Sequence, residues 1–297
     1  MLYQYSQYTF PALIIIGIII GVFIILKKIK KIELDKKSYD RLIVIFAAAG
    51  LAFYIGARLF DDLFHFLSGE GAHHGGITFL GGMISAILVL VILMLIFLKP
   101  IRRKFFVILN IVVIGITIGH SIGRIGCFTA GCCYGKITTS WIGINFKGEA
   151  ELRQTSGGNY YIHLFGSDGY EDLFKDKVEE LGYSINKVYT SKVQAEYVLN
   201  EAKNYAETTK LIPTQLIEAL FLLLLFFLLF FIKNLQSHLY LIIYGIYRFF
   251  IEFLRNDNRG STLIGISPSQ LISIIIVIVG IISLIWYLHL KKKDLVE

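Results

Sequence analysis

Seven long stretches of hydrophobic residues run through the chain, separated by polar segments. Each comes close to the roughly 17 to 25 residues that an α-helix needs to cross a bilayer, so the pattern predicts transmembrane helices. Their expected ranges are Phe10 to Leu26, Leu42 to Phe60, Ile77 to Leu98, Phe105 to Ile122, Leu211 to Ile232, Leu239 to Leu254 and Leu271 to Leu288. We therefore expect an all-α polytopic membrane protein of about seven spans. Lysines rather than a small-residue cleavage site follow the first stretch, which predicts a retained helix and not a signal peptide.

One long polar segment, residues 136–210, interrupts this pattern between the fourth and fifth stretches. Trp141–Phe146 and Tyr160–Phe165 resemble short strands, and Ser191–Thr208 has the apolar spacing of an amphipathic helix. The segment is predicted to form a small α+β head outside the membrane, with no catalytic motif and a scaffold or docking role. The predicted division is 1–135 for helices one to four and the loop after them, 136–210 for the head, and 211–297 for helices five to seven.

Basic residues gather in alternate connections, which predicts how the chain crosses the membrane. Lysines and arginines cluster at 27–41, at 99–104 and at 291–293, and such clusters mark the cytoplasmic side. With seven spans, the N-terminus is then outside and the C-terminus cytoplasmic. The net charge of +7 is explained by this asymmetry and by attraction to the membrane surface. We expect no nucleic-acid partner.

The run from Gly123 to Gly135, just after the predicted fourth helix, combines one arginine, four glycines and all three cysteines of the chain. Glycines let the backbone turn sharply or approach a ligand closely. An arginine near hydrocarbon depth costs several kcal/mol unless an anion or acid meets it. The run therefore predicts a site that contains negative charge.

The predicted sixth helix carries Tyr244, Arg248, Glu252 and Arg255 at spacings of four, four and three, which place them on one face. Arg248 and Glu252 could neutralise each other as a structural pair. Glu252 can balance only one charge, however, and Arg124 and Arg255 are expected at the same membrane level. We interpret the group as an anion site.

Three further groups leave their roles open. Gln215 and Glu218 share a face at the start of the fifth helix, where they either cap the helix or take part in a site. Gly81 and Gly82 either allow close helix contact or make room for a headgroup. The cysteines could form a disulfide, pack as small buried residues or, with His120, bind a metal. Their Cys-x4-Cys-Cys spacing matches no common zinc pattern, so we expect no metal. The full cysteine set is Cys127, Cys132 and Cys133.

Five blocks in order along the membrane part resemble the prolipoprotein diacylglyceryl transferase family. They are Gly56-Ala-Arg-Leu59, Gly76 to Gly82, Gly123-Arg-Ile-Gly126 with Gly131 and Gly135, Pro213-Thr-Gln-Leu with Glu218-Ala219, and Tyr244 to Arg255. The resemblance implies an enzyme of the bacterial inner membrane that moves the diacylglyceryl group of phosphatidylglycerol onto the lipobox cysteine of a prolipoprotein. It implies phosphatidylglycerol, prolipoprotein signal peptides and the lipid bilayer as partners, and no cofactor.

The same resemblance implies which residues act. Arg124 and Arg248 would clamp the lipid phosphate, with Glu252 and Tyr244 orienting Arg248. The family usually has a histidine where this chain has Leu80, so the base is expected from the neighbouring loop, with His74 first and His73 or His120 behind it. The implied substrate-binding residues are Arg58, Gly81, Gly82, Gly123, Gly126, Gly135, Gln215, Glu218 and Tyr244.

Two other functions remain open. A non-catalytic member would bind or move phospholipid without forming product. A membrane thiol redox protein would use Cys127, Cys132 and Cys133 as a reversible dithiol.

Overall fold

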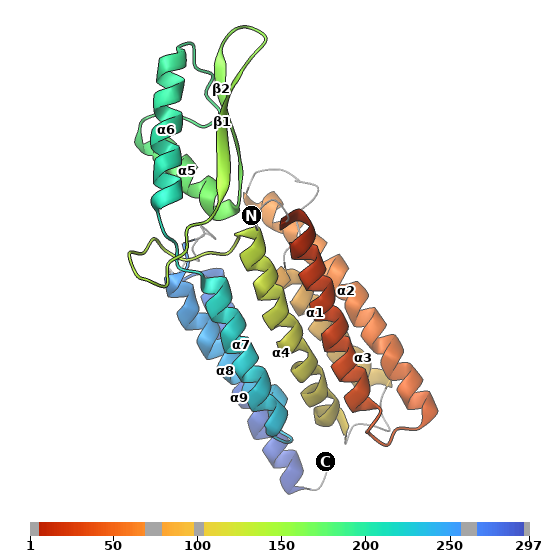
Figure 1. The fold of residues 1–297 in the computed structure, drawn as a ribbon. Coiled ribbons are helices and arrows are strands. Elements are labelled where there is room, and N and C mark those ends of the chain that lie inside the picture. The colour runs from red at the N-terminus through yellow and green to blue at the C-terminus, as the bar shows by residue number, and fades with distance from the viewer. Residues whose placement is uncertain (1–5, 69–78, 98–103, 257–265, 294–297) are drawn as a thin grey trace. The chain divides into compact units, whose positions relative to one another are not determined.

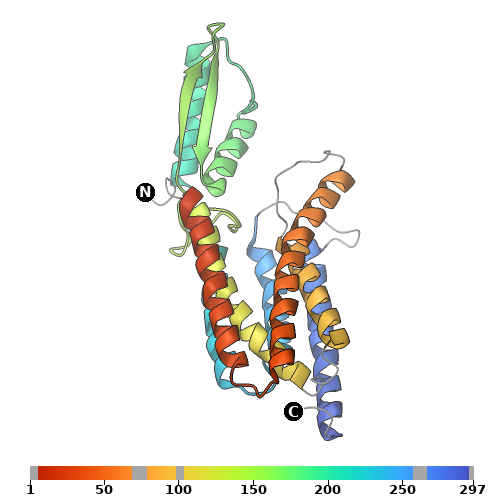
Figure 2. The same ribbon diagram turned by 90° about the vertical axis from the view of Figure 1, so that its right-hand side faces the viewer.

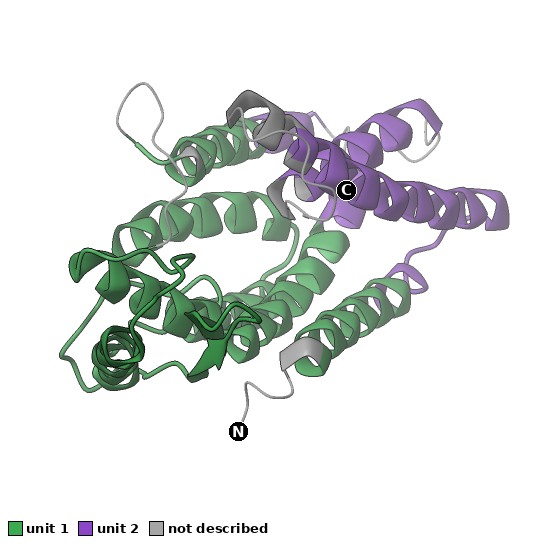
Figure 3. Ribbon diagram, turned by 90° about the horizontal axis from the view of Figure 1, so that it is seen from above, with its two compact units in different colours: residues 1–27, 110–285 green, residues 28–109, 286–297 purple. Residues whose placement is uncertain are grey.

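A computed structural model describes residues 6–68, 79–97, 104–256 and 266–293 (Figure 1). The chain divides into two compact units, coloured separately in Figure 3. The first unit holds residues 1–27 and 110–285, and the second holds residues 28–109 and 286–297. Each unit is described by itself.

Helices occupy all seven predicted places. They are α1 (Ser6–Ile29), α2 (Lys36–Ser68), α3 (Phe79–Phe97), α4 (Phe105–Ala130), α7 (Thr214–Phe231), α8 (Gln236–Ile251) and α9 (Pro268–Lys292). Within the described residues, α1, α2, α4, α7 and α9 are long and apolar enough to cross a membrane. The α3 helix contributes a shorter apolar segment, and the 16 residues of α8 extend only about 24 Å against about 30 Å of hydrocarbon. The helical, multi-pass class is confirmed, but the count of seven spans is not.

The α4 helix is longer than predicted, because it ends at Ala130 and not at Ile122. Two glycines in its middle, Gly115 and Gly119, face α1. A side-chain carbon on Gly115 would lie 2.6 Å from the carbonyl oxygen of Gly21 on α1, and one on Gly17 would lie 2.8 Å from that of Gly119. Small residues at such crossings let two helix backbones approach closely. The glycine-rich pattern therefore marks helix packing here.

In the second unit, α2 and α3 pack against each other through glycines. A side-chain carbon on Gly81 would lie 2.3 Å from Cβ of Phe60, and one on Gly82 would lie 2.9 Å from the ring of Phe53. From the other side, Gly56 meets the side chain of Ser85. Of the two interpretations that the sequence left open for Gly81 and Gly82, the described residues fit close helix contact.

The head contains an antiparallel pair of strands, β1 (Gly148–Gln154) and β2 (Tyr160–Gly166), with helices α5 (Asp168–Glu180) and α6 (Lys192–Thr208). Both Figures 1 and 2 show α6 running beside the strands. For the head, the predicted strand at 160–165 and the predicted helix at 191–208 are confirmed within one residue. The predicted strand Trp141–Phe146 is wrong, because this segment forms only an isolated bridge from Ile144 to Leu211. The side chain of Trp141 is 90% exposed, so no packing stabilises a strand there.

The head has its own hydrophobic core, which also reaches the end of α4. Apolar side chains of α5 and α6 meet those of the strands, and Phe128 and Tyr134 pack against the same cluster. The hydroxyl of Tyr134 donates a short hydrogen bond to Asp172 of α5. The amide of Gly169 donates to the carbonyl of Gly131 at 3.1 Å. The head is thus anchored to the segment that follows α4. The predicted domain limits at 135 and 210 stay a prediction.

Candidate functional site

The segment from Gly131 to Gly135 forms a tight turn between α4 and the head. Both Gly131 and Cys133 have positive φ, at 74° and 62°, and for cysteine this conformation is uncommon. The start of α7 stabilises the turn, because Thr214 Oγ1 donates to the carbonyl of Cys133 at 2.7 Å and Gln215 Nε2 donates to that of Cys132 at 2.5 Å. The first turn of α7 therefore fixes where the cysteines lie.

Gly135 brings the turn against the end of α8. Its amide donates to the carbonyl of Ile212 at 2.8 Å, and the next amide, of Lys136, donates to the carbonyl of Leu254 at 2.8 Å. A side-chain carbon at Gly135 would lie 2.6 Å from the oxygen of Leu254. Only glycine fits this close approach. The end of α4, the start of α7 and the end of α8 thus meet at one place.

Glu218 of α7 lies at the centre of this meeting point, with its side chain 1% exposed. Its Oε2 lies 3.0 Å from Nε of Arg124 on α4. Its Oε1 accepts a hydrogen bond from the hydroxyl of Tyr244 at 3.1 Å and lies 3.8 Å from Nε2 of His120. One buried carboxylate therefore joins three helices, α4, α7 and α8. The sequence showed only that Glu218 lies near the start of a helix and did not predict these contacts.

A second carboxylate, Glu252, organises the end of α8. Its Oε2 lies 2.7 Å from Nη1 of Arg248 and 4.0 Å from Nε of Arg255, while its Oε1 accepts from the hydroxyl of Ser267 at 3.0 Å. Arg248 also donates from Nη2 to the hydroxyl of Ser269 at 3.1 Å. The predicted pairing of Arg248 and Glu252 along one helix face is thus present. Tyr244, by contrast, contacts Glu218 and not Arg248.

These contacts leave a surplus of positive charge in the described part of the cluster. Three arginines, Arg124, Arg248 and Arg255, face two carboxylates, and their side chains are 13%, 10% and 3% exposed. Arg248 and Arg255 also interact electrostatically with Glu218, so the groups around Glu218 and Glu252 form one charged cluster. Guanidinium groups shielded from water can donate charge-assisted hydrogen bonds to an anion. The cluster is therefore suited to bind a negatively charged group.

Aromatic rings of α8 surround the cluster and add residues that the sequence did not indicate. The ring of Tyr244 stacks on that of Tyr240 and meets His120 edge-on, and Tyr247 stacks on Phe221 at 3.6 Å between ring centres. The hydroxyl of Tyr247 is buried and has no hydrogen-bond partner among the described residues. A buried hydroxyl without a partner is costly, and a bound ligand would relieve this cost. The only sequence feature that could have indicated Tyr247 as a site residue is its position next to Arg248.

The remaining predicted site residues fall into three groups. Gly123 and Gly126 are part of α4, which corrects their prediction as part of a headgroup loop, and a side-chain carbon on Gly126 would lie 3.4 Å from Phe10 of α1. Arg58, Gly81 and Gly82 belong to the second unit, where the guanidinium of Arg58 lies 5.8 Å from the ring centre of Tyr54. His73 and His74 lie outside the described residues.

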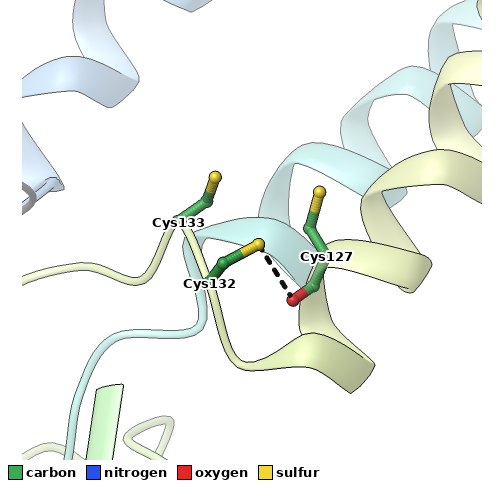
Figure 4. Close-up of side chains that lie close together, drawn as sticks. All are labelled: Cys127, Cys132 and Cys133. Carbon is green, nitrogen blue, oxygen red and sulfur yellow. Dashed lines mark hydrogen bonds between the residues drawn. The ribbon is translucent and has the colours of Figure 1, made fainter. Parts of the chain in front are cut away.

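The three cysteines come together beside this cluster. Their sulfur atoms all lie within 4.8 Å of one another, and none of the three forms a disulfide (Figure 4). Figure 4 shows Cys127 on the last turn of α4, and Cys132, whose thiol donates to the carbonyl of Cys127 at 3.6 Å, directed toward it from the turn. The disulfide that the sequence left open is therefore absent from this structure.

The thiols differ in acidity. Hydrogen bonds from the Cys127 and Cys132 thiols, together with the charges of Arg255 and Arg124, lower the pKa of Cys133. Hydrogen bonds to Cys127 and Cys133, together with burial, raise the pKa of Cys132. One negative charge in the group is thus favoured at Cys133, and further ionisation is opposed.

Comparisons with known proteins agree with the family resemblance of the five sequence blocks. A family model described as "Prolipoprotein diacylglyceryl transferase" matches residues 2–286. A phosphatidylglycerol–prolipoprotein diacylglyceryl transferase of Clostridium tetani is 26% identical over 94% of this chain and 93% of its own length. One from Buchnera aphidicola is 28% identical over 90% and 85%. A second clostridial enzyme, from Clostridium perfringens, is 34% identical over 58% of this chain and 49% of its own.

Proposed function

The chain belongs to the prolipoprotein diacylglyceryl transferase family, and from this we propose that it transfers the diacylglyceryl group of phosphatidylglycerol to the cysteine thiol of a prolipoprotein. One observation within the structure carries the proposal. Among the described residues, three largely buried arginines gather around two carboxylates, and their guanidinium groups can donate hydrogen bonds to a phosphate. The phosphodiester of phosphatidylglycerol supplies such an acceptor group.

The donor phosphate is proposed to bind between Arg124 and Arg248. Each guanidinium is oriented by its own carboxylate, Arg124 by Glu218 and Arg248 by Glu252. A planar guanidinium can donate two parallel hydrogen bonds to phosphate oxygens, which an ammonium cannot. The buried hydroxyl of Tyr247 supplies a further donor at the same place.

The reaction itself is a displacement at carbon. The acceptor sulfur attacks the carbon of the diacylglyceryl group that is bonded to the phosphate oxygen. A C–S bond forms, and the C–O bond between this carbon and the phosphate oxygen breaks. The bonding electrons leave with glycerol phosphate, and the thiol proton passes to a base. Charge then builds on the departing phosphate, and preorganised donors in a site without water stabilise such charge strongly. Arg124 and Arg248 are proposed to act at this step.

A histidine is proposed as the base. A free thiol is only a few per cent ionised at neutral pH, so a base that takes its proton is worth about a hundred- to ten-thousandfold in rate. His74 is the candidate from the loop next to Leu80. His120 is the second candidate, because its Nε2 lies 3.8 Å from Oε1 of Glu218, within the arginine cluster.

The site is proposed to face the outer side of the bacterial inner membrane, with the N-terminus outside and the C-terminus cytoplasmic. The packing of α1 on α4 supports one part of this. Phe10 near the start of α1 is the neighbour of Gly126 near the end of α4, so the start of α1 and the arginine cluster lie at the same end of this unit. The basic clusters at 27–41 and 291–293 would then lie in the cytoplasm.

Purified protein incubated with phosphatidylglycerol vesicles and a synthetic lipobox peptide tests the proposal. We expect the peptide to gain the mass of one diacylglyceryl group, and glycerol phosphate to appear in equal amount. The same peptide with serine in place of its cysteine should stay unchanged. Binding of phosphatidylglycerol without any mass gain would support a non-catalytic lipid-binding member instead. Reversible oxidation of the protein's thiols by the peptide would support a redox protein.

A further inference from the structure

The three cysteines form a site of their own next to the arginine cluster. They are all the cysteines of the chain, they form no disulfide, and their sulfur atoms lie within 4.8 Å of one another. In the reaction proposed above, the peptide brings the reacting thiol, so the group has no role there. Three thiols gathered in one place have a chemistry that the transfer does not use.

The spacing of the sulfur atoms fits one small metal ion. A metal–sulfur bond of about 2.3 Å, as for zinc, separates the sulfur atoms of a three-thiolate complex by about 3.8 to 4.0 Å. The observed spacing exceeds this by less than 1 Å. Side-chain rotation alone can close such a gap. The group therefore needs no backbone rearrangement to hold an ion.

The backbone around the thiols is fixed in advance. Thr214 and Gln215 hold the carbonyls of Cys133 and Cys132, and Cys133 keeps its positive φ under these restraints. Cys127 lies on the last turn of a regular helix. A site whose ligands are already placed loses little conformational entropy when it binds an ion. The local sequence spacing did not predict this, because it arises from the turn and from α7.

Charge indicates the class of ion. A divalent ion bound by three thiolates has a net charge of −1, and a monovalent ion bound in the same way has −2. Arg255 and Arg124 both interact electrostatically with Cys133, and a divalent ion leaves them the smaller negative charge to balance. Soft thiolate ligands favour zinc among the common divalent ions.

We propose that Cys127, Cys132 and Cys133 bind one soft divalent cation of the zinc class through their three sulfur atoms. The ion replaces the thiol protons, so the complex forms with release of up to three protons and with no change in oxidation state. The fourth position of a tetrahedral ion stays open to water or another ligand. This site is separate from the transfer reaction and does not rest on it.

Titration of the purified, chelator-treated protein with cadmium tests the site directly, because cadmium–thiolate bonds absorb ultraviolet light. We expect one ion per chain, with absorbance that corresponds to three thiolates and that zinc reverses by competition. Each single change, Cys127→Ser, Cys132→Ser or Cys133→Ser, should weaken binding at least about tenfold. The matched control is Glu179→Gln, which removes an exposed carboxylate of α5 and should bind as the wild type does.

A second measurement keeps the test decisive if a serine variant folds poorly. In wild-type protein, zinc should protect all three cysteines from alkylation, as read by peptide mass spectrometry. Binding that persists in the triple serine variant would overturn the proposal. So would unchanged alkylation of the three cysteines at saturating zinc. A disulfide in the protein as isolated, with one thiol left, would show that the group is a redox pair instead.

Discussion

The carboxylate of Glu218 lies 3.0 Å from the guanidinium of Arg124, and the two side chains are 1% and 13% exposed. This pair joins α7 to α4, and through Tyr244 it reaches α8. Glu218 therefore has two roles: it holds three helices together and it sets the direction in which Arg124 points. A change at Glu218 should affect stability and activity together.

Glu218→Gln should destabilise the protein, because it leaves Arg124 buried without its charge partner. Breaking a largely buried pair costs about 3 to 5 kcal/mol. We expect a clearly lower Tm in detergent for Glu218→Gln, measured by thermal unfolding. Glu179→Gln, the same change at an exposed position of α5, serves as the control. Equal Tm values for the two variants would contradict a structural role for the pair.

Arg248→Ala should lower transfer, and because it also leaves Glu252 without its closest charge partner, its Tm is measured alongside the rate. Loss of a charged hydrogen bond costs about 1.5 to 3 kcal/mol, which corresponds to roughly ten- to more than hundredfold in kcat/KM. Arg248→Lys should recover little, because an ammonium cannot grip two phosphate oxygens in a planar fork. The same assay applied to Arg124→Ala should give a loss of similar size.

The control for both arginine variants is Arg153→Ala, which removes an exposed arginine of β1 that pairs with Glu151. It should keep wild-type activity. If Arg124→Ala and Arg248→Ala also turn over at the wild-type rate, the arginines do not bind the donor.

The sequence predicted the pairing of Arg248 with Glu252 because residues four apart on a helix are neighbours. It did not predict that Glu218 pairs with Arg124, because these residues are distant in the chain and meet only when α4 and α7 pack. For the same reason the cysteine group could not be found from spacing. Cys127 is helical, Cys132 and Cys133 are in a turn, and the contacts that bring them together come from α7.

The end of α4 shows how one signal can have two meanings. Glycine at high density indicates either a loop or a close helix crossing, and both need a residue without a side chain. The choice depends on whether a partner helix is present. Here α1 is that partner at Gly126, where a side-chain carbon would meet Phe10 and Leu13, and the helix continues past Ile122 to Ala130.

Replacement of all three cysteines by serine or alanine should leave more than about a tenth of the transfer activity of the metal-free enzyme. The acceptor brings its own thiol, so only modest packing costs are expected. The rate is measured with phosphatidylglycerol vesicles and the lipobox peptide. Complete loss in folded protein, together with a lipid trapped on one cysteine of the wild type, would instead indicate a covalent intermediate.

Cys133 should react with iodoacetamide at lower pH than Cys132 in chelator-treated protein. The thiolate is the reactive form, and an unperturbed thiol has a pKa of about 8.5. Because the pKa of Cys133 is lowered, its labelling should persist as the pH falls below that value. Because the pKa of Cys132 is raised, its labelling should fade at higher pH.

Peptide mass spectrometry across a pH series reads both cysteines in one sample. In Cys127→Ala, which removes a hydrogen bond to Cys133, the labelling profile of Cys133 should move to higher pH. Identical profiles for Cys132 and Cys133 in the wild type would argue against this ordering of the thiols.

The proposed base can be identified by comparing His74→Ala, His120→Ala and Leu80→His. Loss of a general base typically costs about a hundred- to ten-thousandfold in rate, and it also removes the base's limb from the pH profile of kcat/KM. A residue that matters only for packing would lower the rate without changing that profile. His120 contacts Glu218, so its variant needs a check of Tm alongside the rate.

Three outcomes are distinguishable in this comparison. If His74→Ala alone loses rate and the pH limb, the base comes from the loop, and the same result for His120→Ala alone places it beside Glu218. If both variants keep full activity with an unchanged profile, neither histidine is the base. If the wild type is inert and Leu80→His alone creates activity, this chain has kept the arginines for the donor phosphate but has lost the transfer reaction, and phosphatidylglycerol binding should then persist without product.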